Sequence, residues 1–163
     1  MGETMGETME RIASFSIDHD VLQKGMYVSR IDGDIVTYDI RMVRPNAGYY
    51  IDTAALHTFE HLFATYVRNS RHSKSVVYVG PMGCRTGFYF LVRDDLGNQQ
   101  ALDLFRETLA FIEAFEGPIP GASKSAECGN YLEHDLGSAR KVAADMTRVL
   151  KDWTVADMAY NAH

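Results

Sequence analysis

The chain has 163 residues, of which 46% are hydrophobic and 23% charged, and its formal net charge at pH 7 is −6. These values are ordinary for one globular domain, and the lack of a basic tract argues against nucleic-acid binding. No apolar run is long enough to span a bilayer and no signal peptide opens the chain, so we expect a cytoplasmic protein without a membrane partner. The repeated MGET at the start predicts a disordered segment over residues 1–13, followed by one domain over residues 14–163.

The predicted elements alternate between strands and helices. Residues 34–43 alternate apolar and polar side chains, which predicts a half-buried strand, and residues 51–70 predict a helix capped by Asp52 or Thr53. Two strands, SVVYVGPM and GFYFLVR, follow and are joined by GCRTG. An amphipathic helix over residues 99–115, a Pro/Gly/Ser-rich loop over residues 117–130 and a helix over residues 134–153 complete the chain. This order predicts an α+β fold, an antiparallel sheet with helices packed on it.

The first predicted helix carries the stretch LHTFEHLFATY, in which His57, Glu60 and His61 share one face. Glu60 is the only formally charged residue between positions 53 and 67, so we expect a helix buried on nearly all sides. Side chains four residues apart can bring two imidazoles onto one metal ion, and H-x-x-E-H is a known order in zinc sites. The alternative is a pair of core histidines capped by carbonyl groups or water, and the pattern favours the metal.

Each of the two cysteines allows a functional and a structural interpretation. Cys128, in SAECGNY, lies in a flexible loop and offers a soft thiolate as a third ligand, or is a small buried hydrophobe. Cys84, in PMGCRTG, lies in a glycine-flanked turn, where Arg85 could favour its thiolate. A free structural cysteine explains Cys84 equally well.

The segments HTFEHL, PMGCRTGFY and ECGNY, in this order, resemble the S-ribosylhomocysteine lyases, the LuxS quorum-sensing enzymes. SFSIDHD, YDIRMVRPN, PIPG and HDLGSAR fit the same family, and the resemblance runs from Ser14 to about Leu150. It implies an α+β two-layer sandwich and a homodimer whose two identical active sites lie at the interface.

The resemblance also implies roles for individual residues. His57, His61 and Cys128 would hold one Fe(II) ion per subunit, which zinc or cobalt can replace. Glu60 and Cys84 would be the two acid/base groups. Three further positions would help to hold the substrate, the first two by reaching across the dimer interface: Ser14, His19 and Arg41.

The implied reaction splits S-ribosylhomocysteine into homocysteine and 4,5-dihydroxy-2,3-pentanedione, the precursor of autoinducer-2. The sugar carbonyl must first move from C1 to C3, and each shift moves a proton between neighbouring carbons. A base can then take the C4 proton and expel the thiolate from C5. This sequence requires a Lewis acid and two proton carriers, which match the metal, Glu60 and Cys84.

Two other functions are compatible with part of the pattern. A small H-x-x-E-H zinc metallopeptidase would use Glu60 to activate a water molecule, but no downstream helix offers an obvious third glutamate ligand. A non-catalytic metal-binding dimer module would explain His57 and His61 but leave Glu60 and the GCRTG turn without a function. Release of a free thiol from S-ribosylhomocysteine distinguishes the three.

Overall fold

The computed structural model describes residues 10, 12, 15 and 17–162. Its sheet has the order β1-β2-β4-β3, and every neighbouring pair is antiparallel. The strands are β1 (Gly25–Asp32), β2 (Ile35–Arg41), β3 (Val76–Pro81) and β4 (Gly87–Arg93). The helices are α3 (Thr53–Arg68), α4 (Asn98–Ala114) and α5 (Leu136–Val149), with short 3-10 turns at Ser73–Ser75, Val155–Met158 and Tyr160–Ala162. The predicted α+β class is confirmed, whereas the predicted disordered segment over residues 1–13 lies almost wholly outside the described residues.

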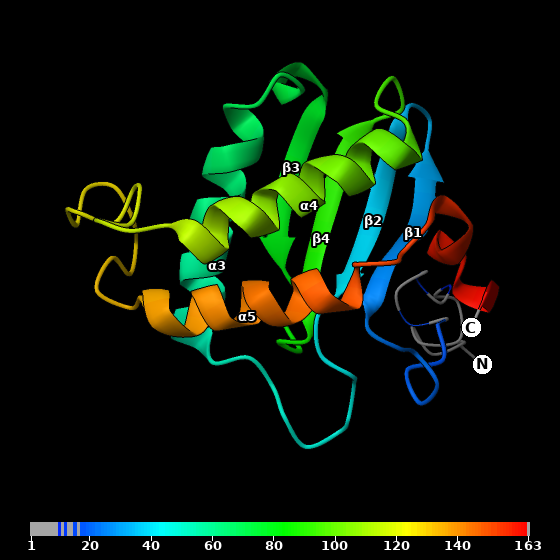
Figure 1. Ribbon diagram of the computed structural model, residues 1–163, viewed down its shortest axis with the longest axis horizontal. Coiled ribbons are helices and arrows are strands. Elements are labelled where there is room, and N and C mark those ends of the chain that lie inside the picture. The colour runs from blue at the N-terminus through cyan, green and yellow to red at the C-terminus, as the bar shows by residue number, and fades with distance from the viewer. Residues whose placement is uncertain (1–9, 11, 13–14, 16, 163) are drawn as a thin grey trace, which may run out of the picture.

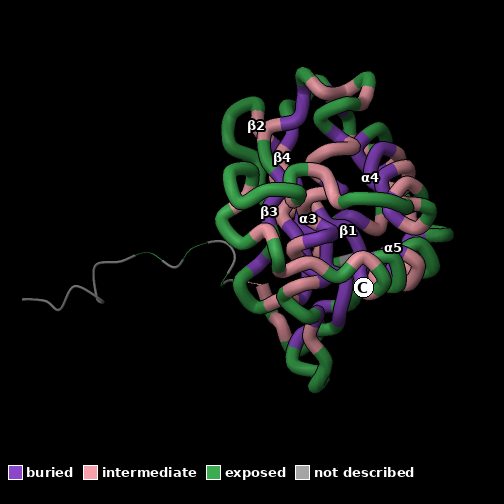
Figure 2. Tube along the Cα trace, turned by 90° about the vertical axis from the view of Figure 1, so that its left-hand side faces the viewer, coloured by how far each residue is buried: buried purple, intermediate pink, exposed green. Residues whose placement is uncertain are grey.

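The helices cover one face of the sheet, and α4 and α5 cross in front of the strands (Figure 1). Aromatic side chains form the centre of this layer, where the ring of Phe63 on α3 lies 5.1 Å from Phe90 and 5.2 Å from Phe105. The ring centroid of Phe59, also on α3, lies 5.1 Å from that of Phe88 on β4. Buried stretches of the chain accordingly gather in the interior, and exposed ones lie on the loops (Figure 2). The core therefore fixes α3, which carries the histidine motif, directly against β4.

Most predicted elements are confirmed, but the edge strand β1 was not predicted. Its burial does not alternate, because Gly25, Met26 and Tyr27 are all buried and the strand ends in exposed residues. A register irregularity between Val28 and Arg30 further disturbs the pattern. Period-two alternation, the main sequence signal of a half-buried strand, is therefore missing here.

The prediction of a half-buried β2 is wrong for its polar face. Asp39 is 0% exposed and Arg41 is 2% exposed, and the two form an ion pair with an N–O distance of 2.8 Å. Arg41 also donates to Thr86, and Asp39 accepts from Tyr160 near the C-terminus. Segments distant in sequence thus cover this end of the outer face, which a local pattern cannot reveal.

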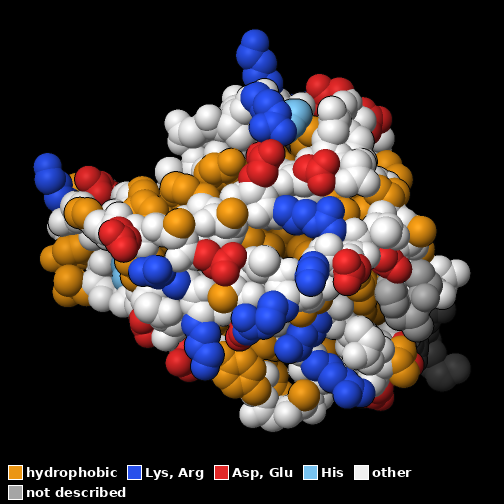
Figure 3. Space-filling model, viewed as in Figure 1, with side chains coloured by type: hydrophobic (Ala, Val, Ile, Leu, Met, Phe, Trp, Pro, Cys, Tyr) orange, Lys and Arg blue, Asp and Glu red, His pale blue; other side chains and the backbone are white. Residues whose placement is uncertain are grey.

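Within the described part of the chain, no helix is both long and apolar enough to cross a membrane. The helix side of the molecule carries charged groups of both signs, interspersed over α4 and α5 (Figure 3). Basic side chains on α5 and just after it are exposed, namely Arg140, Lys141, Arg148 and Lys151.

Candidate metal centre and acid/base site

Four side chains from three segments converge at one end of α3. His57 and His61 come from the helix, Cys128 from the long loop after α4, and His134 from the position just before the α5 N-cap. One donor atom of each lies within 4.8 Å of all the others. This is the largest convergence of metal-ligand atoms among the described residues, and it joins the predicted third ligand to the histidine pair.

The distances inside this group match the spacing of ligands around one ion. The Nε2 atoms of His57 and His61 are 3.1 Å apart, and the Cys128 Sγ lies 3.2 Å and 3.8 Å from them. Ligands held about 2.0–2.3 Å from a tetrahedral metal are themselves roughly 3.3–3.6 Å apart. The donor set therefore fits a divalent transition metal.

The Nδ1 atom of each histidine ring has a hydrogen-bond partner that leaves the Nε2 atom free to bind a cation. His57 Nδ1 lies 2.9 Å from the carbonyl oxygen of Glu133, and His61 Nδ1 lies 2.7 Å from that of Pro120. A carbonyl only accepts, so both Nδ1 atoms carry the hydrogen and both Nε2 lone pairs face the centre of the group. Capping by carbonyl groups alone would leave these lone pairs facing each other.

His134, to which the sequence assigned no role, stacks on His57 with ring centroids 4.1 Å apart. Burial and the neighbouring rings of His57 and His61 lower the pKa of His134 to about 4, so it is neutral at pH 7. Its Nδ1 bonds to the Thr58 hydroxyl at 3.0 Å, and its buried Nε2 has no hydrogen-bond partner within the described structure. The fold brings His134 to Thr58 although the two are 76 residues apart in the chain, so only its place before an N-cap could have drawn attention to it.

The prediction of a helix buried on nearly all sides is wrong for the motif face. His57, Glu60 and His61 are only partly buried, whereas the opposite face is closed by the core. A groove opens beside them and is lined by Glu60, His61, Tyr78 and Gly121, among others. Glu60 thus lies beside His61 at an open groove, where solvent and a bound molecule can reach its carboxylate.

Cys84 lies in a different cavity, of about 430 Å³, which also contains His19 and Arg41. The Arg41 Nη1 atom lies 4.0 Å from the Cys84 Sγ and donates to the Thr86 hydroxyl at 2.8 Å. The prediction that Arg85 supplies the positive charge is wrong, because its guanidinium lies over the Tyr50 ring, 5.8 Å from the centroid. Arg41 is the cation at the thiol.

The predicted site residues therefore form two groups. The metal group contains His57, His61 and Cys128, with Glu60 beside it, and the thiol group contains the residues Cys84, His19 and Arg41. The cavities of Glu60 and Cys84 share no lining residue among those described. Ser14 lies outside the described residues.

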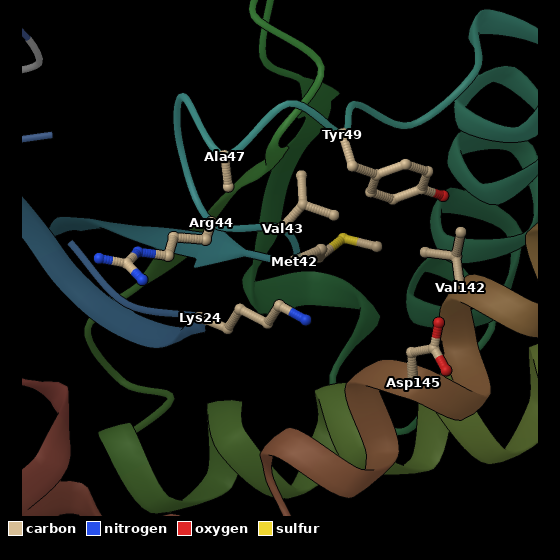
Figure 4. A pocket seen from close by; sticks show the side chains of 8 residues that line it. All are labelled: Lys24, Met42, Val43, Arg44, Ala47, Tyr49, Val142 and Asp145. Atoms are coloured by element: carbon tan, nitrogen blue, oxygen red, sulfur yellow. The ribbon is translucent and has the colours of Figure 1, made fainter. Parts of the chain in front are cut away.

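A third cavity lies on the helix side, between α5 and the loop after β2 (Figure 4). Met42, Val43 and Val142 form its apolar wall, with the Lys24 ammonium and the Asp145 carboxylate at its rim. No predicted site residue lines it, so it is not part of the candidate site.

Comparison with known proteins gives one consistent result. The family model described as S-Ribosylhomocysteinase (LuxS) matches residues 12–156. An S-ribosylhomocysteine lyase of Clostridium acetobutylicum is 45% identical over 153 residues, covering 88% of this chain and 96% of the relative. One of Phocaeicola vulgatus is 46% identical over 158 residues, covering 93% and 98%. One of Clostridium beijerinckii is 49% identical over 140 residues, covering 83% and 87%.

Proposed function

The chain belongs to the S-ribosylhomocysteinase (LuxS) family, and we propose that it is the lyase that splits S-ribosylhomocysteine into homocysteine and 4,5-dihydroxy-2,3-pentanedione. The observation that carries this proposal is the convergence of His57, His61 and Cys128 beside Glu60. A metal that can accept a sugar oxygen and a carboxylate that can move a proton are what the carbonyl shifts require. The dione is the precursor of autoinducer-2.

We propose that His57, His61 and Cys128 hold one ion per chain, Fe(II) or, in its place, zinc or cobalt. Bound there, the ion would act as a Lewis acid toward the sugar oxygens. Thr58 supports three ligands rather than four. Its Oγ1 accepts from the Asp135 backbone N–H at 2.9 Å and can then donate to His134 Nδ1. The neutral His134 ring would then carry its hydrogen on Nε2, and a nitrogen that carries a hydrogen cannot serve as a fourth ligand.

Glu60 and Cys84 are the proposed proton carriers. Each carbonyl shift removes a proton next to the carbonyl and returns it to the neighbouring carbon. The last step removes the C4 proton, and the C5–S bond breaks as its electron pair leaves with sulfur. Arg41 and His19, whose side chains line the cavity of the thiol, are proposed to hold the substrate together with Ser14.

A homodimer would unite the two groups of residues. Within one chain, the Glu60 groove and the Cys84 cavity are separate. The outer face of the sheet, without helices, carries the apolar side chains of Tyr78, which is 54% exposed, and of the half-buried Leu91. We propose that two copies pack through this face, so that the thiol group of one protomer completes the metal site of the other.

The direct test of the activity is thiol release. Metal-loaded protein is mixed with S-ribosylhomocysteine, and free homocysteine is titrated with a chromogenic disulfide. Wild type should release thiol, and Cys84→Ala should do so at least ~10²-fold more slowly while keeping its metal, because one positioned proton carrier is lost. Hydrolysis of peptide substrates without cleavage of S-ribosylhomocysteine would instead favour the metallopeptidase. Metal binding with neither reaction would favour the non-catalytic module.

The shared site has its own test in mixed dimers of Cys84→Ala and Glu60→Gln chains. Neither homodimer should turn over substrate. If Cys84 and Glu60 meet across the interface, one of the two sites in each mixed dimer keeps both groups, and activity returns on co-expression. If both groups come from one chain, every site in the mixture lacks one of them, and continued inactivity would reject the arrangement.

A further inference from the structure

The C-terminal segment is anchored on the edge strand β1, beside which it lies in Figure 1. Trp153 donates its indole N–H to the Met26 carbonyl at 2.9 Å. Its ring lies over Gly25, where an added Cβ would be 2.4 Å from the nearest ring carbon. Tyr160 stacks on Tyr27 with centroids 5.0 Å apart and planes 20° apart. The segment is thus packed onto the strand next to β2.

Tyr160 reaches from this segment to the buried ion pair of β2. Its hydroxyl donates to the Asp39 Oδ2 atom at 2.7 Å. Arg41 donates to the same carboxylate through Nη2 at 2.8 Å and Nε at 3.1 Å. The remaining guanidinium nitrogen, Nη1, bonds to Thr86 and faces Cys84. A continuous set of hydrogen bonds therefore leads from the C-terminus to the thiol cavity.

Burial strengthens the electrostatic interactions within this set of hydrogen bonds. Asp39 and Arg41 have almost no exposed surface, so water does not screen either charge or replace a lost partner. The hydroxyl takes up part of the carboxylate's hydrogen-bonding capacity, which would otherwise go to the guanidinium. It also fixes the plane of the carboxylate and, through two bonds, the plane of the guanidinium. How much positive charge reaches the cavity therefore depends on a residue that does not line it.

We propose that Tyr160 is a positioning residue, whose hydroxyl acts through Asp39 to hold the Arg41 guanidinium against the cavity of Cys84 and His19. The expected effect of Tyr160 on turnover rests on the proposed function, in which Arg41 holds the substrate. Its expected effect on the positive charge beside Cys84 is independent of that function, because the contacts are the same for any substrate. Sequence adjacency gives no sign of this role, since 121 residues separate Tyr160 from Asp39.

The test compares two alkylating reagents at Cys84, of which iodoacetate is anionic and iodoacetamide neutral. Both react with the same thiolate, so the ratio of their rates reports the positive charge beside it. Tyr160→Phe keeps the ring that stacks on Tyr27 and removes only the hydroxyl. In metal-loaded protein, this variant should lower the iodoacetate preference about 2–10-fold, the equilibrium equivalent of one hydrogen bond. Peptide mapping separates Cys84 from Cys128.

Tyr38→Phe is the matched control. Tyr38 is buried, and its hydroxyl donates to Asn98 Oδ1 at 2.6 Å, on the helix side of the same strand. It should leave the preference unchanged. Trp153 is the only tryptophan of the chain, so an unchanged emission spectrum in Tyr160→Phe shows that the segment is still docked.

An unchanged preference in Tyr160→Phe, or an equal fall in both tyrosine variants, would overturn the proposal. With S-ribosylhomocysteine, Tyr160→Phe should raise KM more than it lowers kcat, because a binding group is displaced and the proton carriers are intact. Absence of turnover in wild type would refute the proposed function and still leave the alkylation result to decide on Tyr160.

Discussion

Each ring of the histidine pair has its two nitrogen atoms committed to different partners. The Nδ1 atoms bond to the carbonyls of Glu133 and Pro120, and this fixes both the tautomer and the ring orientation. The Nε2 atoms of His57 and His61 are thereby turned toward each other and toward Cys128. The orientation of both rings thus depends on backbone groups of a loop.

Cys128 should be essential for metal retention. Its Sγ lies 3.2 Å from His57 Nε2 and 3.8 Å from His61 Nε2. Cys128→Ala should weaken metal binding by more than the ~10–100-fold typical for loss of an outer-shell partner. Metal content after gel filtration, measured by mass spectrometry, checks this, with Cys84→Ala as the control that keeps its ion. Full occupancy in Cys128→Ala would remove it from the ligand set.

The residues that could be predicted from sequence are those whose signal is local. His57, Glu60 and His61 share one helical turn, and Cys128 lies in a recognisable loop motif. His134 and Tyr160 were missed because their partners, Thr58 and Asp39, are distant in the chain. Their environment exists only after packing.

The same distinction holds for the elements. The helices α3, α4 and α5 and the strand β2 were predicted from the pattern of their apolar residues, and the strands β3 and β4 from their β-branched and aromatic residues. The strand β1 was missed because it buries three consecutive residues and owes this to the Trp153 segment packed on it. At the start of β4, just after the turn from β3, Gly87 pairs with Arg41, and the backbone of β2 comes close to its Cα.

Gly87→Ala should be strongly destabilising. An added Cβ would lie 1.9 Å from the Ile40 carbonyl oxygen, which belongs to the neighbouring backbone and cannot rotate away. Overpacking of this kind costs about 1–3 kcal/mol, and a backbone obstacle places this site at or above the upper limit. Urea unfolding measures the loss. Gly83→Ala, in the same turn, meets nothing within 4 Å and should stay within ~0.5 kcal/mol of wild type.

Tyr38 on β2 should make the protein sensitive to alkali. Burial raises the pKa of Tyr38 to about 12, whereas an unfolded tyrosine titrates near ~10. Between these values the unfolded chain has lost a proton that the folded chain keeps, so stability falls as pH rises, by up to ~1.4 kcal/mol per unit. Unfolding curves from pH 9 to 11.5 should therefore show a shallower decline for Tyr38→Phe. Parallel declines would show that this tyrosine does not contribute.

The whole molecule has one covered and one open sheet face. Helices cover the inner face (Figure 1), whereas the outer face keeps Tyr78 in solvent and Leu91 partly exposed. We propose that this face is the contact surface of the dimer. Tyr78 lines both the Glu60 groove and a cavity on this face that Tyr89 and Leu91 also line, so the face borders the groove.

Leu91→Asp should therefore dissociate the proposed dimer without unfolding the chain. Leu91 lies on the outer face of β4 and is only partly buried, so a carboxylate there stays solvated in a monomer but is desolvated in the dimer. Sedimentation velocity should show a smaller species with unchanged circular dichroism. Lys141→Asp, on the exposed side of α5, should sediment like wild type. Identical sedimentation of both variants would place the interface elsewhere.

The loop between α4 and α5, residues 115–135, contains no helix or strand, and it reaches α3 through the two histidine rings. Pro120 and Glu133 bind their Nδ1 atoms, and Cys128 approaches their Nε2 atoms. An ion at this point would act as a crosslink between a helix and an otherwise irregular stretch of chain. Part of its binding free energy would stabilise the ordered conformation of that stretch. Metal starvation would then remove one wall of the groove along with the ion, and reloading would be a local folding reaction whose rate stops rising once metal is in excess.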